Sequence, residues 1–143
     1  MTHMYRLLLV LVMPVALCSC GSGFRKEWSR ARTDGGIHGR WSGTWKSEVN
    51  GHSGFLRCVV KDGSSPEKKT FIYRAGWMKI LATTVATEKV VTKTAEGWQF
   101  TGSKDLGSFG DFSATGVIKG DEFSARYDSS LDKGAFTMKR VAD

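Results

Sequence analysis

The feature that most constrains the fold of this chain is the alternation of apolar and polar residues in short segments from residue 37 onward. In the first segment, Trp41 and Trp45 share one face of a strand that is expected to run to Val49, because successive side chains on a strand point to opposite faces. Asn50-Gly51 then predicts a hairpin turn of two residues or slightly more, because both central residues of a type I′ turn need a positive φ. This pattern predicts an all-β domain.

The same alternation continues to the end of the chain. Further strands are expected around residues 56–60, Thr70–Ala75, Met78–Thr84, Thr87–Thr94, 98–106, 112–118, 123–128 and 136–140. These eight or nine short strands are joined by turns and by no crossover of helix length, so they must pair antiparallel. Because each strand has one apolar face, we expect a single antiparallel up-and-down barrel, with a β-sandwich as the alternative.

The N-terminal residues have the pattern of an export signal. Arg6 precedes eleven residues, Leu7 to Leu17, that contain no polar side chain. A helix of this length is too short for the roughly 30 Å hydrocarbon core of a membrane, and Pro14 opposes a permanent helix. The run therefore predicts a secretory signal peptide over residues 1–19.

The residues Leu17-Cys18-Ser19-Cys20-Gly21 resemble the bacterial lipoprotein signal. In that signal an aliphatic residue and two small residues precede a cysteine, which receives a diacylglycerol and becomes the N-terminus. The resemblance implies that Cys20 is the lipid anchor and that the protein is held on a membrane of the cell envelope, the outer membrane where the host has one, facing the periplasm or the cell surface. Acyl chains, at about 0.8 kcal/mol per buried methylene, would make this attachment stable. The alternative is an ordinary signal cleaved near Ser19, which releases a soluble protein.

Residues 20–36 are expected to form a lipidated tether, and residues 37–143 the barrel domain. The tether is rich in glycine at both ends, as flexible linkers are. Between these ends, Phe24, Trp28 and Ala31 fall at helical spacing among basic residues. The stretch fits a short amphipathic helix lying on anionic headgroups, and it fits a disordered spacer equally well.

The start of the first strand contains Gly39-Arg40-Trp41 and Gly43-Thr44-Trp45. Either resembles the Gly-x-Trp motif that opens calycin barrels, the lipocalin superfamily, in which a Trp of the first strand packs under an Arg of the last. Arg140 has the same parity as the apolar Phe136, so it points inward, where a charged group needs a partner. The resemblance implies a calycin-like barrel in which Arg140 stacks on Trp41 or Trp45.

A second resemblance extends over nearly all of residues 39–140. It rests on Gly39-x-Trp41-x-Gly43-x-Trp45, on the segment from Asn50-Gly51-His52-Ser53-Gly54 to Leu56-Arg57-Cys58, on Tyr127-x-Ser129 and on Asp132-x-Gly134-x-Phe136-x-Met138-x-Arg140. These motifs are similar to those of a family of small, uncharacterised exported bacterial domains. The resemblance implies the fold and the export, and it implies no activity.

The expected inward face of the barrel is rich in aromatic residues. The candidates for lining a ligand site or filling the core are Trp41, Trp45, Tyr73, Trp98, Phe100, Phe112, Phe123, Tyr127 and Phe136. In an eight-stranded barrel such residues either fill the interior or leave room for one small ligand. We expect a non-catalytic structural or interaction barrel, and the alternative is a carrier that binds a small apolar ligand inside the barrel.

Catalytic and metal-binding patterns are weak. Gly51-His52-Ser53-Gly54 invites a hydrolase interpretation, the third alternative, but a nucleophile elbow would need Gly where Phe55 stands. His38 and His52 have no further ligand at the spacing of a zinc site. We therefore expect no enzyme activity, no metal and no cofactor.

The net charge of +7 suggests attraction to anionic partners. The basic residues are spread along the sequence, and Lys68-Lys69 and Lys139-Arg140 are short pairs rather than a stripe. A nucleic-acid site would need such a stripe, so we expect no nucleic-acid partner. The expected partners are the membrane, through the lipid, and a small apolar ligand; the protein is expected to be a monomer.

Overall fold

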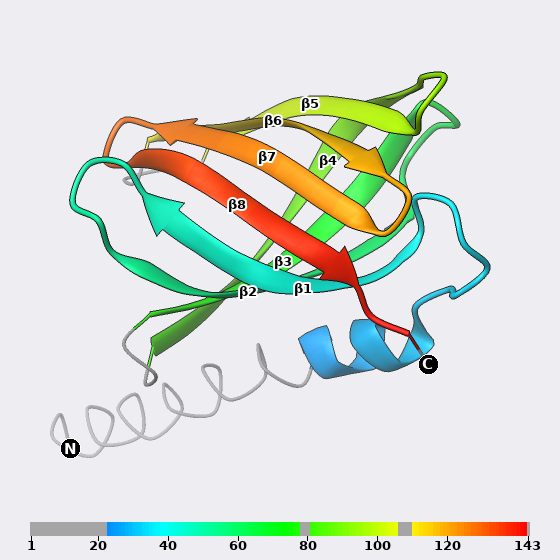
Figure 1. The fold of residues 1–143 in the computed structure, drawn as a ribbon, viewed down its shortest axis with the longest axis horizontal. Coiled ribbons are helices and arrows are strands. Elements are labelled where there is room, and N and C mark those ends of the chain that lie inside the picture. The colour runs from blue at the N-terminus through cyan, green and yellow to red at the C-terminus, as the bar shows by residue number, and fades with distance from the viewer. Residues whose placement is uncertain (1–22, 78–80, 106–109, 143) are drawn as a thin grey trace, which may run out of the picture. The chain divides into compact units, whose positions relative to one another are not determined.

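The computed structural model describes residues 23–77, 81–105 and 110–142 (Figure 1). The expected signal peptide and Cys20 lie outside these residues. The chain divides into two compact units, residues 1–30 and residues 31–143. The second unit contains eight strands, β1 (Gly39–Ser47), β2 (Ser53–Asp62), β3 (Lys68–Trp77), β4 (Leu81–Lys93), β5 (Trp98–Asp105), β6 (Asp111–Lys119), β7 (Glu122–Ser129) and β8 (Lys133–Arg140).

The strands form one closed barrel in which each pairs with the next along the chain and β8 pairs with β1 (Figure 1). Every pairing is antiparallel, so the expected up-and-down barrel is confirmed and the alternative of a sandwich is wrong. The strand number is eight because the segments expected at Met78–Thr84 and Thr87–Thr94 belong largely to a single strand, β4. Residues 78–80 lie outside the described part of the chain. The Thr-rich stretch of β4 suits one long extended strand, since β-branched residues favour that conformation.

The first hairpin is longer than its turn sequence suggests. Strand β1 ends at Ser47, two residues before the expected end, and Val49 is exposed in the turn that follows. Ser47 Oγ accepts the Val49 N–H at 3.1 Å. Such a local side-chain bond competes with the backbone hydrogen bonds between strands, so the strand ends here. Asn50 Oδ1 accepts the His52 N–H at 2.9 Å, and Gly51 has φ of 75°, as its place in a turn requires.

At the end where β1 begins, around Trp41, the barrel interior is filled with aromatic side chains. Trp41 contacts Phe123 with ring centroids 5.6 Å apart, and Phe100 lies 4.9 Å from Phe71 and 5.1 Å from Phe123. Each of these side chains is at most 2% exposed, and Ile118 packs into the same cluster. This part of the interior is a solid core, and it stabilises the barrel by burying apolar surface.

The wall of the barrel is split between β4 and β5. Strand β4 pairs with β3 from Trp77↔Leu81 to Lys68↔Val90, but its described pairing with β5 begins only at Val90↔Thr101 and continues to Lys93↔Trp98. Lys104 Nζ bridges the split by donating to the Ala86 carbonyl at 2.6 Å. The two strands therefore leave a cavity of about 580 Å³ in the wall, and its lining includes Thr87, Lys89 and Lys104.

In the first unit, residues 23–30 form a short helix. Phe24 and Trp28 lie one turn apart on it, with ring centroids 5.8 Å apart. Of the two interpretations of this stretch, the structure contains the helix. Its contact with a membrane stays a prediction.

Candidate functional site

One end of the barrel is closed by the side chain of Arg140. Its guanidinium carbon lies 4.3 Å from the centroid of the Trp41 ring, a cation–π distance. Arg140 also donates to the carbonyls of His38 at 3.0 Å, Gly120 at 3.2 Å and Gly36, and to Asp121 Oδ1 at 2.9 Å. The permanent charge of the guanidinium is thus satisfied by a ring face, carbonyl oxygens and one carboxylate.

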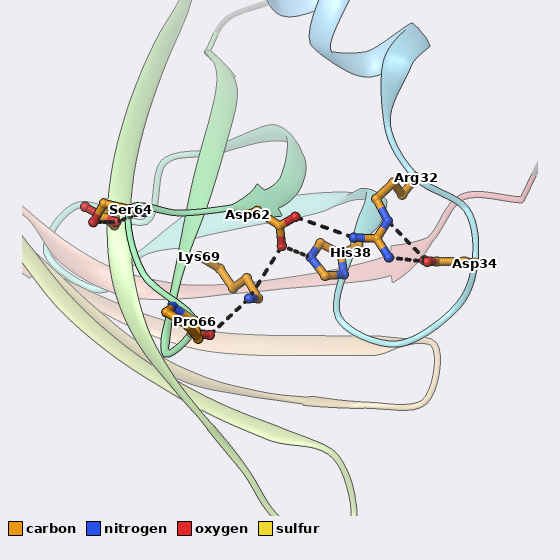
Figure 2. Close-up of polar contacts among 8 residues, drawn as sticks. Arg32, Asp34, His38, Asp62, Ser64, Pro66 and Lys69 are labelled. Atoms are coloured by element: carbon orange, nitrogen blue, oxygen red, sulfur yellow. Dashed lines mark hydrogen bonds and ion pairs between the residues drawn. The ribbon is translucent and has the colours of Figure 1, made fainter.

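A group of charged residues gathers around Asp62 at the same end (Figure 2). Asp62 Oδ1 lies 2.8 Å from His38 Nε2 and 3.6 Å from Lys69 Nζ, and Arg32 Nη1 lies 3.6 Å from Asp62 Oδ2. The hydrogen bond from His38, with its charge and those of the other cations, lowers the pKa of Asp62. These contacts tie residues 32–38 to the ends of β2 and β3, and exposed ion pairs of this kind add little stability each.

The opposite end of the barrel holds an apolar cavity of about 250 Å³ that opens to solvent. It is lined by side chains from seven strands and one turn: Trp45, Leu56, Tyr73, Ala75, Thr83, Val85, Phe112, Tyr127, Asp132 and Phe136. The rings of Tyr73 and Phe136 form an edge contact, with centroids 5.7 Å apart. A cavity of this size and lining is near the lower limit for small-molecule sites.

The edge of this cavity carries one organised polar group. Asp132, in the turn between β7 and β8, accepts hydrogen bonds from Ser47 Oγ at 2.5 Å and from Tyr127 OH at 3.0 Å. Burial and the bond to Asp132 raise the pKa of Tyr127. The three side chains satisfy one another and fix the turn against β1, so this group shapes the cavity edge rather than offering a reactive atom.

A second polar group lies inside the barrel, on the inward faces of β3 and β4. Lys89 is 1% exposed, and its Nζ lies 5.7 Å from the ring centroids of both Phe71 and Tyr73. Within the described chain, Lys89 Nζ, Tyr73 OH and Thr87 Oγ1 are buried without a hydrogen-bond partner. Buried polar groups are normally paired, so this cluster is exceptional.

The structure separates the predicted site residues into two sets. Trp45, Tyr73, Phe112, Tyr127 and Phe136 line the cavity, whereas Trp41, Phe100 and Phe123 lie in the solid core. Trp98 is half-buried against that core, with Lys93 Nζ 5.8 Å from its ring. Arg140 stacks on Trp41 and not on Trp45, whose Nε1 donates to the Gly76 carbonyl at 3.0 Å.

Lys89 was not among the residues singled out from the sequence. It shares its parity with Thr87 and Val91, which would place it on the inward face of a strand. The neighbouring Glu88 and Val90 make the opposite face equally mixed, so the alternation alone does not decide which face is buried. The register of β4 against the aromatic residues of β3 is what identifies it.

The candidate hydrolase residues lie at the first hairpin. Ser53 is an exposed residue at the start of β2, and the His52 ring packs on Trp77 with centroids 5.1 Å apart. Over residues 23–77, 81–105 and 110–142, no group of three or more His, Cys, Asp or Glu side chains is arranged to hold a metal ion.

Comparison with protein-family profiles, with curated proteins and with solved structures finds no match to this chain. No helix among the described residues has both the length and the apolar character needed to cross a bilayer.

Proposed function

We propose that the protein is a lipoprotein of the cell envelope, anchored through Cys20, whose barrel binds a small apolar ligand in the cavity at its open end. The observation that supports ligand binding is that the aromatic residues fill one end of the interior but surround a cavity of about 250 Å³ at the other. The anchor is supported by the sequence of residues 7–21.

The cavity suits an apolar guest for a physical reason. Its lining is almost entirely hydrocarbon and aromatic, and moving apolar surface from water into such a lining gains about 25 cal/mol per Å². The polar group at its edge, Asp132 with Ser47 and Tyr127, is already satisfied. An apolar guest beside this group would therefore leave none of its three side chains unpaired.

The proposal is tested with N-phenylnaphthylamine, a small neutral apolar dye that accepts energy from tryptophan. Titrated into the detergent-purified protein, it should quench tryptophan emission in a saturable way, since Trp45 lines the cavity. Ala75→Phe fills the cavity and should abolish saturation. Ala82→Phe makes the same change at an exposed position of β4 and should bind like the parent.

The proposal would be refuted if the parent shows no saturable transfer beyond that of detergent alone, or if Ala75→Phe binds as the parent does. The first result would favour the second candidate, a structural or interaction barrel. That candidate is supported by exposed apolar side chains near the same end of the barrel, in the turns and adjoining strand ends: Val49, Phe55, Trp77 and Leu131.

A further inference from the structure

The first part of β4 has a strand partner on one side only. Residues Leu81–Lys89 all pair with β3. On their other side they pair with no strand in the described part of the chain, because the ladder with β5 begins at Val90↔Thr101. This side of residues Leu81–Lys89 is called the free edge below. Such an edge presents a row of N–H and C=O groups with which another extended chain can pair.

One contact identifies the backbone groups that face the free edge. The N–H and C=O of one strand residue point to the same side, and those of the next residue point to the opposite side. The Ala86 carbonyl faces the split between β4 and β5, because Lys104 Nζ donates to it at 2.6 Å. By alternation, Ala82 and Thr84 also direct their N–H and C=O groups into the split. No described strand pairs with them there.

The free edge lacks the charges that usually protect an exposed strand. Natural edge strands are commonly blunted by Lys, Pro or another charged residue on the strand itself. Residues 81–87 read Leu-Ala-Thr-Thr-Val-Ala-Thr, which contains no charge, no proline and no glycine and is mostly β-branched. Ala82 and Ala86 are exposed, and their small side chains leave the backbone accessible. A segment of this composition pairs readily with an added strand.

The cavity in the split is predominantly basic. Its lining includes Lys68, Lys89 and Lys104 and one acidic residue, Glu88. Glu88 Oε1 already accepts the Ser64 N–H at 2.6 Å. An extended chain that enters the split therefore meets an excess of positive charge.

Arg74 of β3 adds a positive charge on the outer face of the free edge, where its Nη1 donates to Thr84 Oγ1 at 2.9 Å. Within the described chain, neither Arg74 nor Lys104 forms an ion pair with a carboxylate. A second copy of this chain would bring the same cations to the edge, and like charges across an interface are costly. Charge complementarity therefore favours an acidic partner over a homodimer.

We propose that the free edge binds an extended acidic segment of another protein, which adds as a strand along residues 82–86. Main-chain hydrogen bonds to Ala82 and Thr84 supply the affinity, and the surrounding cations select acidic side chains. Thr83 and Val85 point inward and line the apolar cavity, so the inward side chains of the added segment are apolar. This surface goes beyond the proposed ligand site and does not depend on it.

The test uses a fluorescein-labelled peptide of alternating Val and Thr with Glu at both ends. It is titrated into the full-length protein in detergent and followed by fluorescence anisotropy, with detergent alone as the blank. Two further peptides separate the causes of binding: one has Lys in place of Glu, and one is N-methylated at alternate residues and cannot donate from one side. We expect saturable binding of the acidic peptide and binding about tenfold weaker or less for the other two.

Two variants with matched controls locate the site. Thr84→Pro removes an N–H that the pairing with β3 does not use, as edge strands tolerate, and Thr84→Val keeps that N–H. Lys104→Met removes one cation, and Lys93→Met makes the same change at an exposed lysine over Trp98, where β4 is paired with β5. We expect Thr84→Pro to weaken binding of the acidic peptide about tenfold and Lys104→Met about threefold, and both controls to bind like the parent. Thermal unfolding shows whether Thr84→Pro is folded, and the N-methylated peptide tests the same hydrogen bonds on the parent.

The outcomes separate the possible occupants of the free edge. Absence of saturable binding by the parent, equal binding by the parent and Thr84→Pro, or equal binding of the acidic and N-methylated peptides would overturn the proposal. Equal affinity for the Glu and Lys peptides would overturn the acidic class. A dimer of the parent in sedimentation that Thr84→Pro dissociates would assign the edge to a second copy of this chain instead. None of these results bears on dye binding in the apolar cavity, which Ala75→Phe tests.

Discussion

Replacing Lys89 by Met should make the unliganded protein more stable. A buried ammonium without a counter-ion destabilises the folded state, because its solvation in water is lost and, among the described residues, only the ring faces of Phe71 and Tyr73 offset part of that loss. Met fills nearly the same volume, and its sulfur can pack on the rings of Phe71 and Tyr73. A substitution that removes a charge from the core should therefore raise the free energy of unfolding.

The magnitude follows from the pKa of Lys89, which burial lowers from 10.5 to about 8. At about 1.4 kcal/mol per pH unit, this difference corresponds to roughly 3 kcal/mol. Below pH 8 the folded and unfolded chains both carry the proton, so the full cost is present. Between pH 8 and pH 10.5 the unfolded chain binds more protons, so the stability contribution of Lys89 rises with pH. The advantage of Lys89→Met should be about 3 kcal/mol at pH 6 and about 2 kcal/mol at pH 9.

The assay is urea unfolding of the parent, Lys89→Met and Lys93→Met at pH 6 and pH 9 in ligand-free detergent. Titration of Cys58 and Tyr73 also changes stability near pH 9, but it affects all three proteins and largely cancels in the differences. Lys93→Met should match the parent within about 0.5 kcal/mol, as an exposed substitution does. The reasoning is refuted if Lys89→Met is less stable than the parent at pH 6, or if its advantage is the same at both pH values.

Three further predictions concern the anchor, the first turn and the closure of the barrel. Cys20→Ser expressed in a bacterial host should accumulate as unprocessed precursor without labelled palmitate, and equal labelling of mutant and parent would contradict the assignment. Gly51→Val should cost roughly 1 kcal/mol or more in thermal unfolding, because φ of 75° strains a β-branched residue although an added Cβ would have nothing within 4 Å. Gly51→Asn, which tolerates this φ, is the control, and equal melting temperatures for all three proteins would count against the strain. Arg140→Ala should cost about 2 kcal/mol through loss of the contact with Trp41, and Arg140→Lys should recover only part of it; silence of both substitutions in denaturant unfolding would show that the stack is not needed.

The barrel could be predicted from the sequence because its cause is local. Each strand from Trp98 onward has a buried face that alternates with an exposed one, and short turns leave no choice but antiparallel neighbours. The ends of elements were less predictable. Val49 continues the alternation of β1, yet the side-chain bonds of Ser47 end the strand before it.

The cavity and the buried lysine could not be predicted in the same way. Whether aromatic residues fill a barrel or surround a cavity depends on how rings from different strands meet across the interior, which the spacing along one strand does not contain. Phe123 and Phe136 look alike in the sequence, but one lies in the solid core and the other also lines the cavity. Lys89 lies on a strand with mixed residues on both faces, so only its pairing with β3 reveals that it is inward.

The pairing of β1 with β8 has a consequence for the time course of folding. Every other ladder joins consecutive strands and needs only a turn to close, whereas this one requires the first and last strands of the domain to meet. The entropy of closing that loop is the largest in the fold, and contacts of this kind slow folding. Until β8 is in place, β1 keeps an unpaired edge and Trp41 lacks the cover of Arg140. Under the proposed export, in which the chain would cross a membrane unfolded, this order would delay completion of the barrel until the C-terminal strand has also emerged.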